Sequence, residues 1–452
     1  MTKRRVTTLE ARSEIDGSAT QDRRVAVVGL GYTGLPLAIA FVEAGLEVEA
    51  IDSSMVRVAG LNARTSPIDD ISDERLAAAL DAGLRVVSLD DARPSGADAI
   101  FVCVPTPITG TKDPDLTAVL AAAAFIRGHL RRGQLVVLQS TTFPGTTNGP
   151  FREAIERDGL TAGTDFDLAY APERVNPGDP ASASKDVPRL VGATTPEATQ
   201  RAAALLANIN DHVVEMSSPD AAELAKLLEN VFRNINIAFA NQLALLCERM
   251  HLDVWEVIAA AATKPFGFMP FSPGPGVGGH CIPVDPYYLS WRARQFDFID
   301  RFVEAAGDIN LAMPRHVVDL TAEALNDRGL ALMGAKVGVV GVAFKPNIQD
   351  ARNSPAADVI AGITARGGQV SFHDPHVPTF RDADGVVRQT TEADVLLDWA
   401  DVIVVLTMHR SVDWASLYRR ARLVVDTVDS SQGHATRPRQ VLRLGAGWST
   451  RL

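Results

Sequence analysis

The chain has 452 residues, and because a single hydrophobic core stops growing at about 250–300 residues, it is expected to form two or three domains. Its formal net charge of −11 argues against a general nucleic-acid-binding protein, which would present a basic face. No apolar run reaches the roughly 18–20 residues that a membrane-spanning helix needs, so no membrane association is expected.

The beginning of the chain does not resemble a secretory signal. Residues 1–22 contain no apolar central region, so they are predicted to form a flexible lead-in. The chain has three cysteines, far apart in the sequence, which do not make the framework of a disulfide-rich domain. A reducing, cytoplasmic location is therefore expected.

Short apolar runs alternate with helical stretches over residues 23–216, a pattern typical of a parallel α/β sheet. The first strand is predicted at Val25–Val28, followed by a glycine loop and a helix to about Ala44. Further strands are predicted at 47–51, 85–88, 99–104, 135–139, 168–171, 189–191 and 213–216. These elements suffice for one doubly wound domain.

The pattern changes over residues 217–330. Residues 220–250 lack Gly and Pro and carry an apolar stripe at helical spacing, which predicts one long helix. A second helix is predicted at about 302–326, after a loop rich in Pro and Gly. At Lys336 the α/β pattern restarts, which predicts a smaller domain over 331–452. The expected fold class is α/β, with two Rossmann-like doubly wound domains joined by a long helical connector.

The loop Gly29-Leu30-Gly31-Tyr32-Thr33-Gly34 follows the first strand and opens a helix. This is the context in which G-x-G-x-x-G binds the pyrophosphate of a dinucleotide. Asp52 ends the next strand, where a carboxylate can accept hydrogen bonds from ribose hydroxyls and would repel a 2′-phosphate. NAD is therefore predicted, while Ser53, Ser54 and Arg57 keep NADP open as an alternative.

The segment from Gly278 to Asp285 contains Cys281 between glycines, a histidine and prolines. An exposed thiolate beside NAD can trap an aldehyde, and the adduct can then be oxidised to a thioester and hydrolysed. The other reading, a small buried hydrophobic residue, fits Cys103 and Cys247 better. Taken alone, the composition of the loop supports both readings of Cys281.

Lys226 and Asn230 are four residues apart and share one face of the long helix. Such a pair can stabilise a developing alkoxide and hold its attacking water. The alternative for Lys226 is a solvated lysine on a helix surface.

Together these motifs resemble the UDP-glucose/GDP-mannose dehydrogenase family, from about Val25 to Asp426. The segments that carry the resemblance are GLGYTGLP, FVCVPTP, QSTTFPGT, APERVNPG, ELAKLLEN, GVGGHCIPVDP, GVAFKPNIQDARNSP and FHDP. The resemblance implies an N-terminal domain for NAD, central helices that form a dimer core, and a C-terminal domain for the nucleotide half of the sugar donor. It also implies two successive hydride transfers for each sugar.

The resemblance implies roles for individual residues. Cys281 matches the family's nucleophile, and Lys226, Asn230 and Asp285 match its acid/base and oxyanion-stabilising group. The remaining catalytic positions are Glu173, which would assist thioester hydrolysis, and Thr141, which would orient water or cofactor. The cofactor-binding positions are Gly29, Gly31, Tyr32, Thr33, Gly34, Asp52, Arg57, Pro105, Thr106, Thr141 and Arg352. The substrate-binding positions are Glu173, Arg174, Val175, Lys226, Asn230, Gly278, Gly279, His280, Phe344 and Lys345. Lys345, Asp350 and Arg352 resemble hinge and site-closing residues.

The form of the cysteine loop indicates a branch of the family. UDP-glucose and GDP-mannose enzymes usually have a C-x-P-K-D run, whereas this chain has Val284 at the lysine position and His280 before the cysteine. This form resembles the branch that acts on UDP-N-acetylhexosamines, and the segment upstream favours UDP-N-acetylglucosamine. UDP-N-acetylmannosamine, UDP-glucose and a non-catalytic nucleotide-sugar sensor remain alternatives, and a hydroxyacid dehydrogenase fits less well.

The expected assembly is a homodimer or a higher homo-oligomer, and the expected product suits polysaccharide biosynthesis or a sugar-containing natural product. The family's arginine that reaches into the partner's site has no clear counterpart, the nearest cations being Lys264 and Arg292. No metal is expected.

Overall fold

The computed structural model describes residues 22–68, 70–156, 159–174, 186–434 and 437–449, and also the backbone of β1 (Thr8–Leu9). The chain divides into two compact units. The N-terminal unit comprises Met1–Glu229 with Tyr287–Phe298, and the C-terminal unit comprises Asn230–Pro286 with Ile299–Leu452. The predicted central segment, 217–330, is thus shared between the two units.

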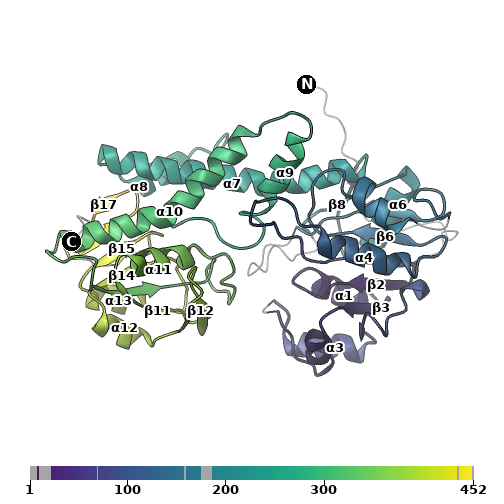
Figure 1. Ribbon diagram of the computed structural model, residues 1–452, viewed down its shortest axis with the longest axis horizontal. Coiled ribbons are helices and arrows are strands. Elements are labelled where there is room, and N and C mark those ends of the chain that lie inside the picture. The colour runs from purple at the N-terminus through teal and green to yellow at the C-terminus, as the bar shows by residue number, and fades with distance from the viewer. Residues whose placement is uncertain are drawn as a thin grey trace. The chain divides into compact units, whose positions relative to one another are not determined.

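A nine-stranded sheet forms the centre of the N-terminal unit, in the order β1-β9-β8-β7-β6-β5-β2-β3-β4 (Figure 1). The predicted strands are present, at β2 (Arg24–Val28), β3 (Glu47–Asp52), β4 (Arg85–Ser88), β5 (Ala99–Val102), β6 (Leu135–Leu138), β7 (Asp167–Tyr170), β8 (Arg189–Ala193) and β9 (Val213–Glu215). Strands β2 to β7 are parallel, but β8 pairs with β7 in antiparallel register. The predicted parallel sheet is thus present from β2 to β7, while the antiparallel direction of β8 was not predicted, because the apolar pattern of a buried strand carries no information about its direction.

Alternate residues of β2 enter two separate cores on the two faces of this sheet. Val25 and Val27 belong to a core that includes residues of α1 and α6, whereas Ala26 and Val28 belong to one that includes residues of α4. This is the two-residue period of a strand buried on both faces. The helices between its strands are α1 (Gly34–Glu43), α2 (Met55–Asn62), α3 (Asp73–Asp81), the short η1 (Pro94–Gly96), α4 (Thr117–Arg127), the short η2 (Thr147–Phe151) with α5 (Arg152–Ile155), and α6 (Pro196–Leu206).

The C-terminal unit contains a second sheet, in the order β11-β10-β14-β15-β16-β17, and a separate hairpin of β12 and β13. Its strands are β10 (Lys336–Val340), β11 (Gln369–His373), β12 (Thr379–Arg381), β13 (Val387–Gln389), β14 (Val402–Val405), β15 (Val424–Asp426), β16 (Val441–Arg443) and β17 (Gly447–Trp448). Its sheet helices are α11 (Pro355–Ala365), α12 (Ala393–Trp399) and α13 (Trp414–Arg420). The second Rossmann-like fold is therefore confirmed.

Two long helices were predicted, the first from its apolar stripe, and both are present, as α7 (Pro219–Met250) and α10 (Arg301–Asn326). Figure 1 shows α10 crossing the second half of α7. The shorter helices are α8 (Val254–Ala262) and α9 (Asp285–Arg294), of which α9 belongs to the N-terminal unit from Tyr287 on. Within the C-terminal unit the two long helices are joined by a buried hydrogen bond of 2.7 Å from Asn310 Nδ2 to Asn234 Oδ1. Pro314 lies inside α10.

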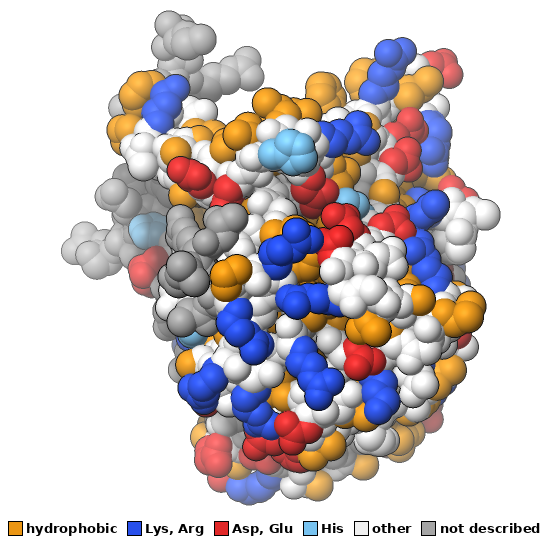
Figure 2. Space-filling model, turned by 90° about the vertical axis from the view of Figure 1, so that its left-hand side faces the viewer, with side chains coloured by type: hydrophobic (Ala, Val, Ile, Leu, Met, Phe, Trp, Pro, Cys, Tyr) orange, Lys and Arg blue, Asp and Glu red, His pale blue; other side chains and the backbone are white. Residues whose placement is uncertain are grey.

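On the face that Figure 2 shows, basic and acidic side chains lie next to one another, so this face is neither uniformly basic nor uniformly acidic. Within the described residues, no helix combines the length and the apolar character needed to cross a bilayer.

Candidate active site

The turn between β2 and α1 has the backbone geometry that a dinucleotide needs. Gly29 has φ of +93°, and a Cβ there would lie 2.5 Å from the carbonyl oxygen of Cys103. A Cβ on Gly34 would lie 1.8 Å from the carbonyl oxygen of Gly29, so only glycine allows the helix to start so close to the strand. Beside Gly31 there is open space, and Thr33 makes no side-chain capping bond at the start of α1. The helix N-terminus can therefore donate to a pyrophosphate, which fits NAD.

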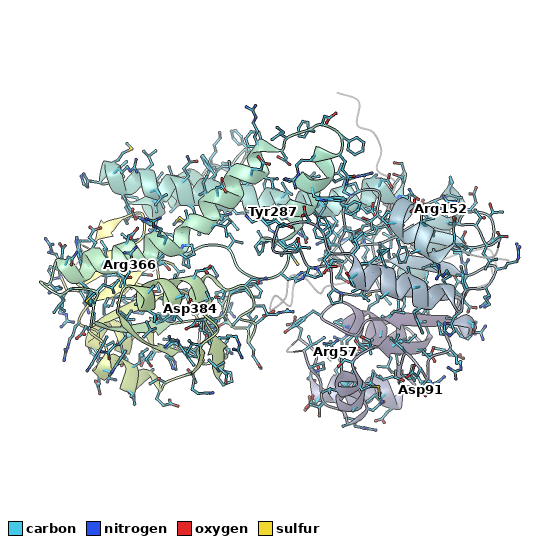
Figure 3. The ribbon with its side chains drawn as sticks, viewed as in Figure 1. Arg57, Asp91, Arg152, Tyr287, Arg366 and Asp384 are labelled. Atoms are coloured by element: carbon cyan, nitrogen blue, oxygen red, sulfur yellow. The ribbon has the colours of Figure 1, made fainter. Side chains whose placement is uncertain are left out.

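Asp52, at the end of β3, is buried under this turn with 5% of its side chain exposed. Its carboxylate accepts hydrogen bonds from Leu30 N at 2.8 Å, Ser54 N at 2.8 Å and Arg57 Nη1 at 3.0 Å. A carboxylate has about four lone-pair positions, so it retains little capacity for ribose hydroxyls. The predicted contact with the ribose stays a prediction. Arg57, labelled in Figure 3, is 41% exposed and is the cation nearest to the acid.

The strand order reverses between β2 and β5, which is the usual ligand position in a doubly wound sheet. Two loops follow β5 and its other neighbour β6. Pro105 is exposed and Thr106 is buried in the first loop. Ser140 Oγ donates to Val104 O at 2.7 Å and joins the two loops just before Thr141, which is half-buried. The buried Tyr288 of α9 donates its hydroxyl to Pro107 O at 3.0 Å and holds the first loop from the other side.

Glu173 follows β7 and lies in a polar cluster. Its Oε2 contacts Arg189 Nη2 at 3.0 Å and accepts from Gln139 Nε2 at 3.2 Å, and its Oε1 accepts from Arg174 N at 2.9 Å. Arg174 pairs in turn with Glu229 at 2.6 Å. Arg189 was missed in the sequence, because an arginine that begins a strand gives no sign that its charge is buried beside a carboxylate. Val175 lies outside the described residues.

The first turns of α7, up to Glu229, belong to the N-terminal unit and pack into its core. Ala222 and Leu227 are buried, and Lys226 is only 7% exposed. The alternative of a solvated surface lysine is therefore wrong for Lys226. Asn230 follows one helical turn later on α7.

The cysteine loop lies in the C-terminal unit and leads directly into α9. Cys281 is exposed, whereas Cys103 and Cys247 are buried, as predicted. The carbonyl of Cys281 accepts from Asp285 N at 2.9 Å and from Val284 N at 3.2 Å, so the cysteine stands at the N-terminal end of the helix. That end of a helix favours a nearby negative charge such as a thiolate.

Asparagines of α7 hold this loop in place. Asn230 Nδ2 donates to Asp285 Oδ2 at 2.5 Å, and Asn230 Oδ1 accepts from Arg233 Nη2 at 2.7 Å. Asn234 Nδ2 donates to Ile282 O at 3.1 Å. Asn230 and Asp285 are 1% and 2% exposed, so the structure brings this predicted pair together in a buried position. Asn234 was missed, although asparagine inside a long helix is itself a signal, since its propensity for helix interiors is low.

The cysteine loop also packs on the segment 344–353 of the same unit. A Cβ on Gly278 would lie 2.7 Å from Phe344 Cβ, and one on Gly279, which has φ of +86°, would lie 2.8 Å from the Phe344 ring. Asn353 Nδ2 donates to Gly279 O at 3.1 Å. Both glycines are therefore required by the close approach of the two segments.

Charged residues follow Phe344 in this segment. Arg352 Nε donates to Asp350 Oδ1 at 2.9 Å, and Lys345 is half-buried. Burial lowers the pKa of His280, and the charge of Arg352 lowers it further, while Asp350 acts in the opposite direction. His280 is therefore a neutral imidazole at neutral pH, which can both donate and accept a hydrogen bond.

The turn after β10 has the same hydrogen-bonding pattern as the turn between β2 and α1, but its acid is fully buried. Gly341 has φ of +81°, and Val342 N donates to Asp374 Oδ2 at 2.7 Å, as Leu30 N does to Asp52. Asp374 also accepts from Ala343 N at 3.0 Å and contacts His409 Nε2 at 3.1 Å. Its side chain is fully buried. This acid supports the turn that carries Phe344 and Lys345 and is closed to a ribose.

The two candidates for a cation that enters a partner's site differ in their surroundings. Arg292 stacks over the Phe143 and Phe296 rings of its own chain, at 5.7 Å and 4.9 Å from the centroids. Lys264 lies over the Phe266 ring at 4.8 Å. Arg292 is thus engaged within the N-terminal unit, and neither residue is assigned to the partner's site.

Comparison with known proteins adds three matches along the chain. Residues 23–210 match the NAD binding domain of the UDP-glucose/GDP-mannose dehydrogenase family, residues 220–312 match its central domain, and residues 338–431 match its UDP binding domain.

Proteins that match most of this chain carry the names of UDP-sugar dehydrogenases. A UDP-N-acetyl-D-mannosamine dehydrogenase of Pyrococcus horikoshii is 34% identical over 411 residues, which cover 89% of this chain and 94% of that protein. A UDP-N-acetyl-D-glucosamine 6-dehydrogenase of Pseudomonas aeruginosa is 36% identical over 359 residues, or 79% and 84%. The solved structure of a UDP-D-ManNAc dehydrogenase from Pyrococcus horikoshii has a TM-score of 0.82 at 32% identity and covers 94% of this chain and 99% of that one.

Proposed function

The chain belongs to the UDP-glucose/GDP-mannose dehydrogenase family and is an NAD-dependent nucleotide-sugar dehydrogenase, and from that premise we propose that it oxidises the C6 hydroxyl of a UDP-N-acetylhexosamine to a carboxylate. The observation that carries the proposal is the exposed Cys281 at the N-terminal end of α9, beside the buried pair of Asn230 and Asp285. A catalytic thiol needs a reducing environment, so we propose the cytoplasm as its location.

The chemistry divides into two oxidations and a hydrolysis. When bound, NAD accepts the hydride that leaves C6 in each oxidation. The first oxidation removes a hydride and the hydroxyl proton and produces an aldehyde. The Cys281 thiolate then adds to C6, and loss of a second hydride from this adduct leaves a thioester. Water adds to the thioester, the C–S bond breaks, and the thiolate returns as the carboxylate forms.

Lys226, Asn230 and Asp285 would support the charged stages of this sequence. An ammonium and an amide N–H can stabilise the oxyanion that forms when sulfur or water adds to C6. Asp285 accepts from Asn230 and so fixes the orientation of its amide. Glu173, held by Arg189, would assist the water in the hydrolysis, and Thr141 would orient water or cofactor. Phe344 and Lys345 would contact the nucleotide sugar beside Gly278 and His280.

UDP-N-acetylglucosamine is the substrate that we propose. A neutral His280 beside the cysteine can donate to an acetamido carbonyl or accept from its N–H. UDP-N-acetylmannosamine is the second candidate, because the Pyrococcus relative carries that name. The two sugars differ only in configuration at C2.

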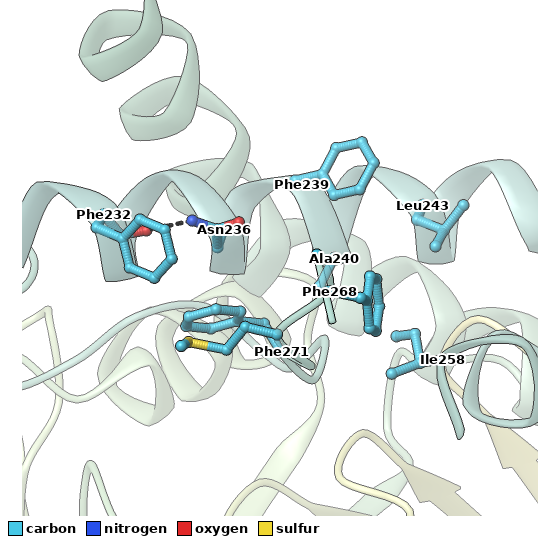
Figure 4. A pocket seen from close by; sticks show the side chains of 10 residues that line it. Phe232, Asn236, Phe239, Ala240, Leu243, Ile258, Phe268 and Phe271 are labelled. Atoms are coloured by element: carbon cyan, nitrogen blue, oxygen red, sulfur yellow. Dashed lines mark hydrogen bonds between the residues drawn. The ribbon is translucent and has the colours of Figure 1, made fainter. Parts of the chain in front are cut away.

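We also propose that the enzyme is a homodimer built on α7. In the C-terminal unit, apolar side chains at spacings of seven, seven and four residues are exposed on this helix: Phe232 (44%), Phe239 (64%), Leu246 (50%) and Met250 (55%). This spacing places them on one face of the helix. A hollow of about 490 Å³ lies along it, lined by Phe232, Asn236, Phe239, Ala240, Leu243, Ile258, Gly267, Phe268, Met269 and Phe271 (Figure 4). A stripe of this kind is typical of a protein interface.

A panel of sugar nucleotides tests the proposed reaction. The purified enzyme would receive NAD with UDP-N-acetylglucosamine, UDP-N-acetylmannosamine, UDP-N-acetylgalactosamine or UDP-glucose, and NADH absorbance would be followed. We expect the highest kcat/KM with UDP-N-acetylglucosamine and a value lower by about 10-fold or more with UDP-glucose, which lacks the acetamido contact. A preference for another N-acetylhexosamine would refute the specific sugar, and no NADH with any of the four would refute the function.

A further inference from the structure

Glu223, on the first turns of α7, is a buried carboxylate for which the proposed reaction has no use. It is 0% exposed and lies one turn before Lys226, on the same face of the helix. Its Oε2 accepts from Gly145 N at 2.6 Å, and its Oε1 accepts from Thr147 N at 2.9 Å and from Thr147 Oγ1 at 2.7 Å. These donors belong to the loop that follows β6 and carries Thr141.

The loop 143–147 also has bonds of its own and contacts with α9. Thr146 N and Thr146 Oγ1 donate to Phe143 O at 3.0 and 2.7 Å, and the ring centroid of the buried Phe143 lies 4.7 Å from that of Trp291. Glu223 supplies buried hydrogen bonds that tie the loop to α7. Asn148 Nδ2 also donates to Asp220 Oδ1 of α7, but this bond is exposed. The Arg292 guanidinium of α9 also lies against Gly145, since a Cβ there would be 2.8 Å from Arg292 Nη2. The loop is therefore in contact both with the carboxylate of Glu223 and with the cation of Arg292.

Burial of the ionised Glu223 carboxylate at this position is energetically unfavourable. Burial raises the pKa of Glu223 to about 7, although hydrogen bonds from Thr147 and Gly145 lower it, and the charge of Asp220 raises it. The charged side chains around this carboxylate in the described residues include Asp220 and Lys226 on α7, one turn before and one turn after it, and Arg292 of α9 lies against the same loop at Gly145. A buried carboxylate that is only half ionised near neutral pH contributes little to stability for its cost. The role of Glu223 is therefore to position the loop 143–147, rather than to stabilise the fold.

We propose that Glu223 is a positioning residue for the oxidation, which in its ionised form holds the loop 143–147, and with it Thr141, against the face of α7 that carries Lys226. The proposal rests on the proposed function for the roles of Thr141 and Lys226. Hydrogen bonds to an ionised acceptor are roughly twice as strong as neutral ones, so protonation loosens the loop. The activity should then fall as the carboxylate takes up a proton.

Glu223→Gln tests the charge with little change in volume. In either orientation the amide places an NH₂ group against a backbone N–H, of Gly145 or of Thr147, so at least one bond to the loop is lost. Glu248→Gln is the matched control, because Glu248 also lies on α7 and accepts a backbone N–H, from Gly445 at 2.8 Å, about 37 Å further along the helix. Thr147→Val is a milder variant that removes only the hydroxyl donor.

The kinetic readout is kcat and KM for NADH formation between pH 6 and 9. We expect Glu223→Gln to lower kcat about 10-fold above pH 8 with little change in the KM of the sugar donor. The ratio of wild-type to variant kcat should rise through pH 7 and then level off. Thr147→Val should shift kcat in the same direction by a smaller factor, which keeps the test valid if Glu223→Gln does not fold. A constant ratio, an unchanged kcat, or an equal effect of Glu248→Gln would overturn the proposal.

Hydrogen exchange without substrate separates this proposal from the proposed function. We expect the amides of Gly145 and Thr147 to lose about 10-fold of their protection in Glu223→Gln and to keep it in Glu248→Gln. If the wild-type enzyme oxidises no UDP-sugar, the proposed function fails, and the exchange result still decides whether Glu223 holds the loop. Unchanged protection of both amides would overturn the proposal on its own.

Discussion

Asp374 shows how one buried carboxylate supports the segment that carries Phe344 and Lys345. Burial raises the pKa of Asp374, but hydrogen bonds from His409 and from the backbone N–H of Ala343 outweigh it and lower the pKa to about 2. His409 Nδ1 accepts from Asn347 N at 3.0 Å, so the same pair also holds the far side of the segment. A group whose pKa is lowered on folding stabilises the protein above its unfolded pKa.

We therefore expect Asp374→Asn to destabilise the protein at neutral pH by about 2–3 kcal/mol, from the size of the pKa shift. The wild-type contribution should be fully present above about pH 5 and should be lost as the pH falls towards 2. The check is the free energy of unfolding from urea titrations between pH 3 and 7. Asp394→Asn, an exposed aspartate on α12 of the same unit, is the control. Equal losses in both variants, or a loss in Asp374→Asn that does not shrink on acidification, would contradict this account.

Single residues could be predicted where their neighbours in the sequence limit their surroundings. Cys281 stands between glycines and prolines and is exposed, whereas the cysteines in apolar patterns are buried. Glu223 and Arg189 could not be found, because their burial depends on which loop or strand packs over them. The partners of Asp52, which are Leu30, Ser54 and Arg57, could not be predicted either, since they are set by the fold of the turn.

Among the elements, α7 contributes to three different parts of the molecule. Its first turns pack on the N-terminal sheet and carry Lys226, its middle holds the cysteine loop through Asn230 and Asn234, and its second half presents the exposed apolar stripe. The helix could be predicted almost to the residue, because no Gly or Pro interrupts it. The direction of β8 could not be predicted, because strand pairing depends on the path of the chain and not on the local pattern.

Phe239→Asp places a charge in the middle of the exposed stripe on α7, where the proposed dimer would bury it. We expect the variant to become monomeric at micromolar concentration, since an unpaired buried charge costs several kcal/mol. Light scattering coupled to size-exclusion chromatography measures the mass. Val395→Asp, on α12, is the control for an exposed apolar side chain outside the stripe, where Val395 is 58% exposed. A monomeric wild-type protein, or a variant that still forms the dimer, would refute the interface.

At the scale of the whole molecule, the two Rossmann-like domains share one turn design and differ in its use. In the first, the glycine turn opens on empty space at Gly31, and α1 starts without a side-chain cap. In the second, Asp374 and His409 are fully buried and Asp374 accepts from the turn as Asp52 does in the first, but the turn presents Phe344 to the glycines of the cysteine loop. The repetition of the α/β pattern at Lys336 was visible in the sequence, but this division of tasks needed the side-chain contacts.

The central claim, that Cys281 carries the sugar through both oxidations, is tested most directly by the ratio of NADH formed to UDP-N-acetylglucosamine consumed. The wild-type enzyme should give two NADH for each sugar oxidised, with a carboxylate as the product. Cys281→Ala should still bind NAD, since its cofactor turn is unchanged, but should form no carboxylate. Cys247→Ala, a buried thiol on α7, should retain the ratio of two. A Cys281→Ala enzyme that makes the sugar acid with two NADH per sugar would contradict the account.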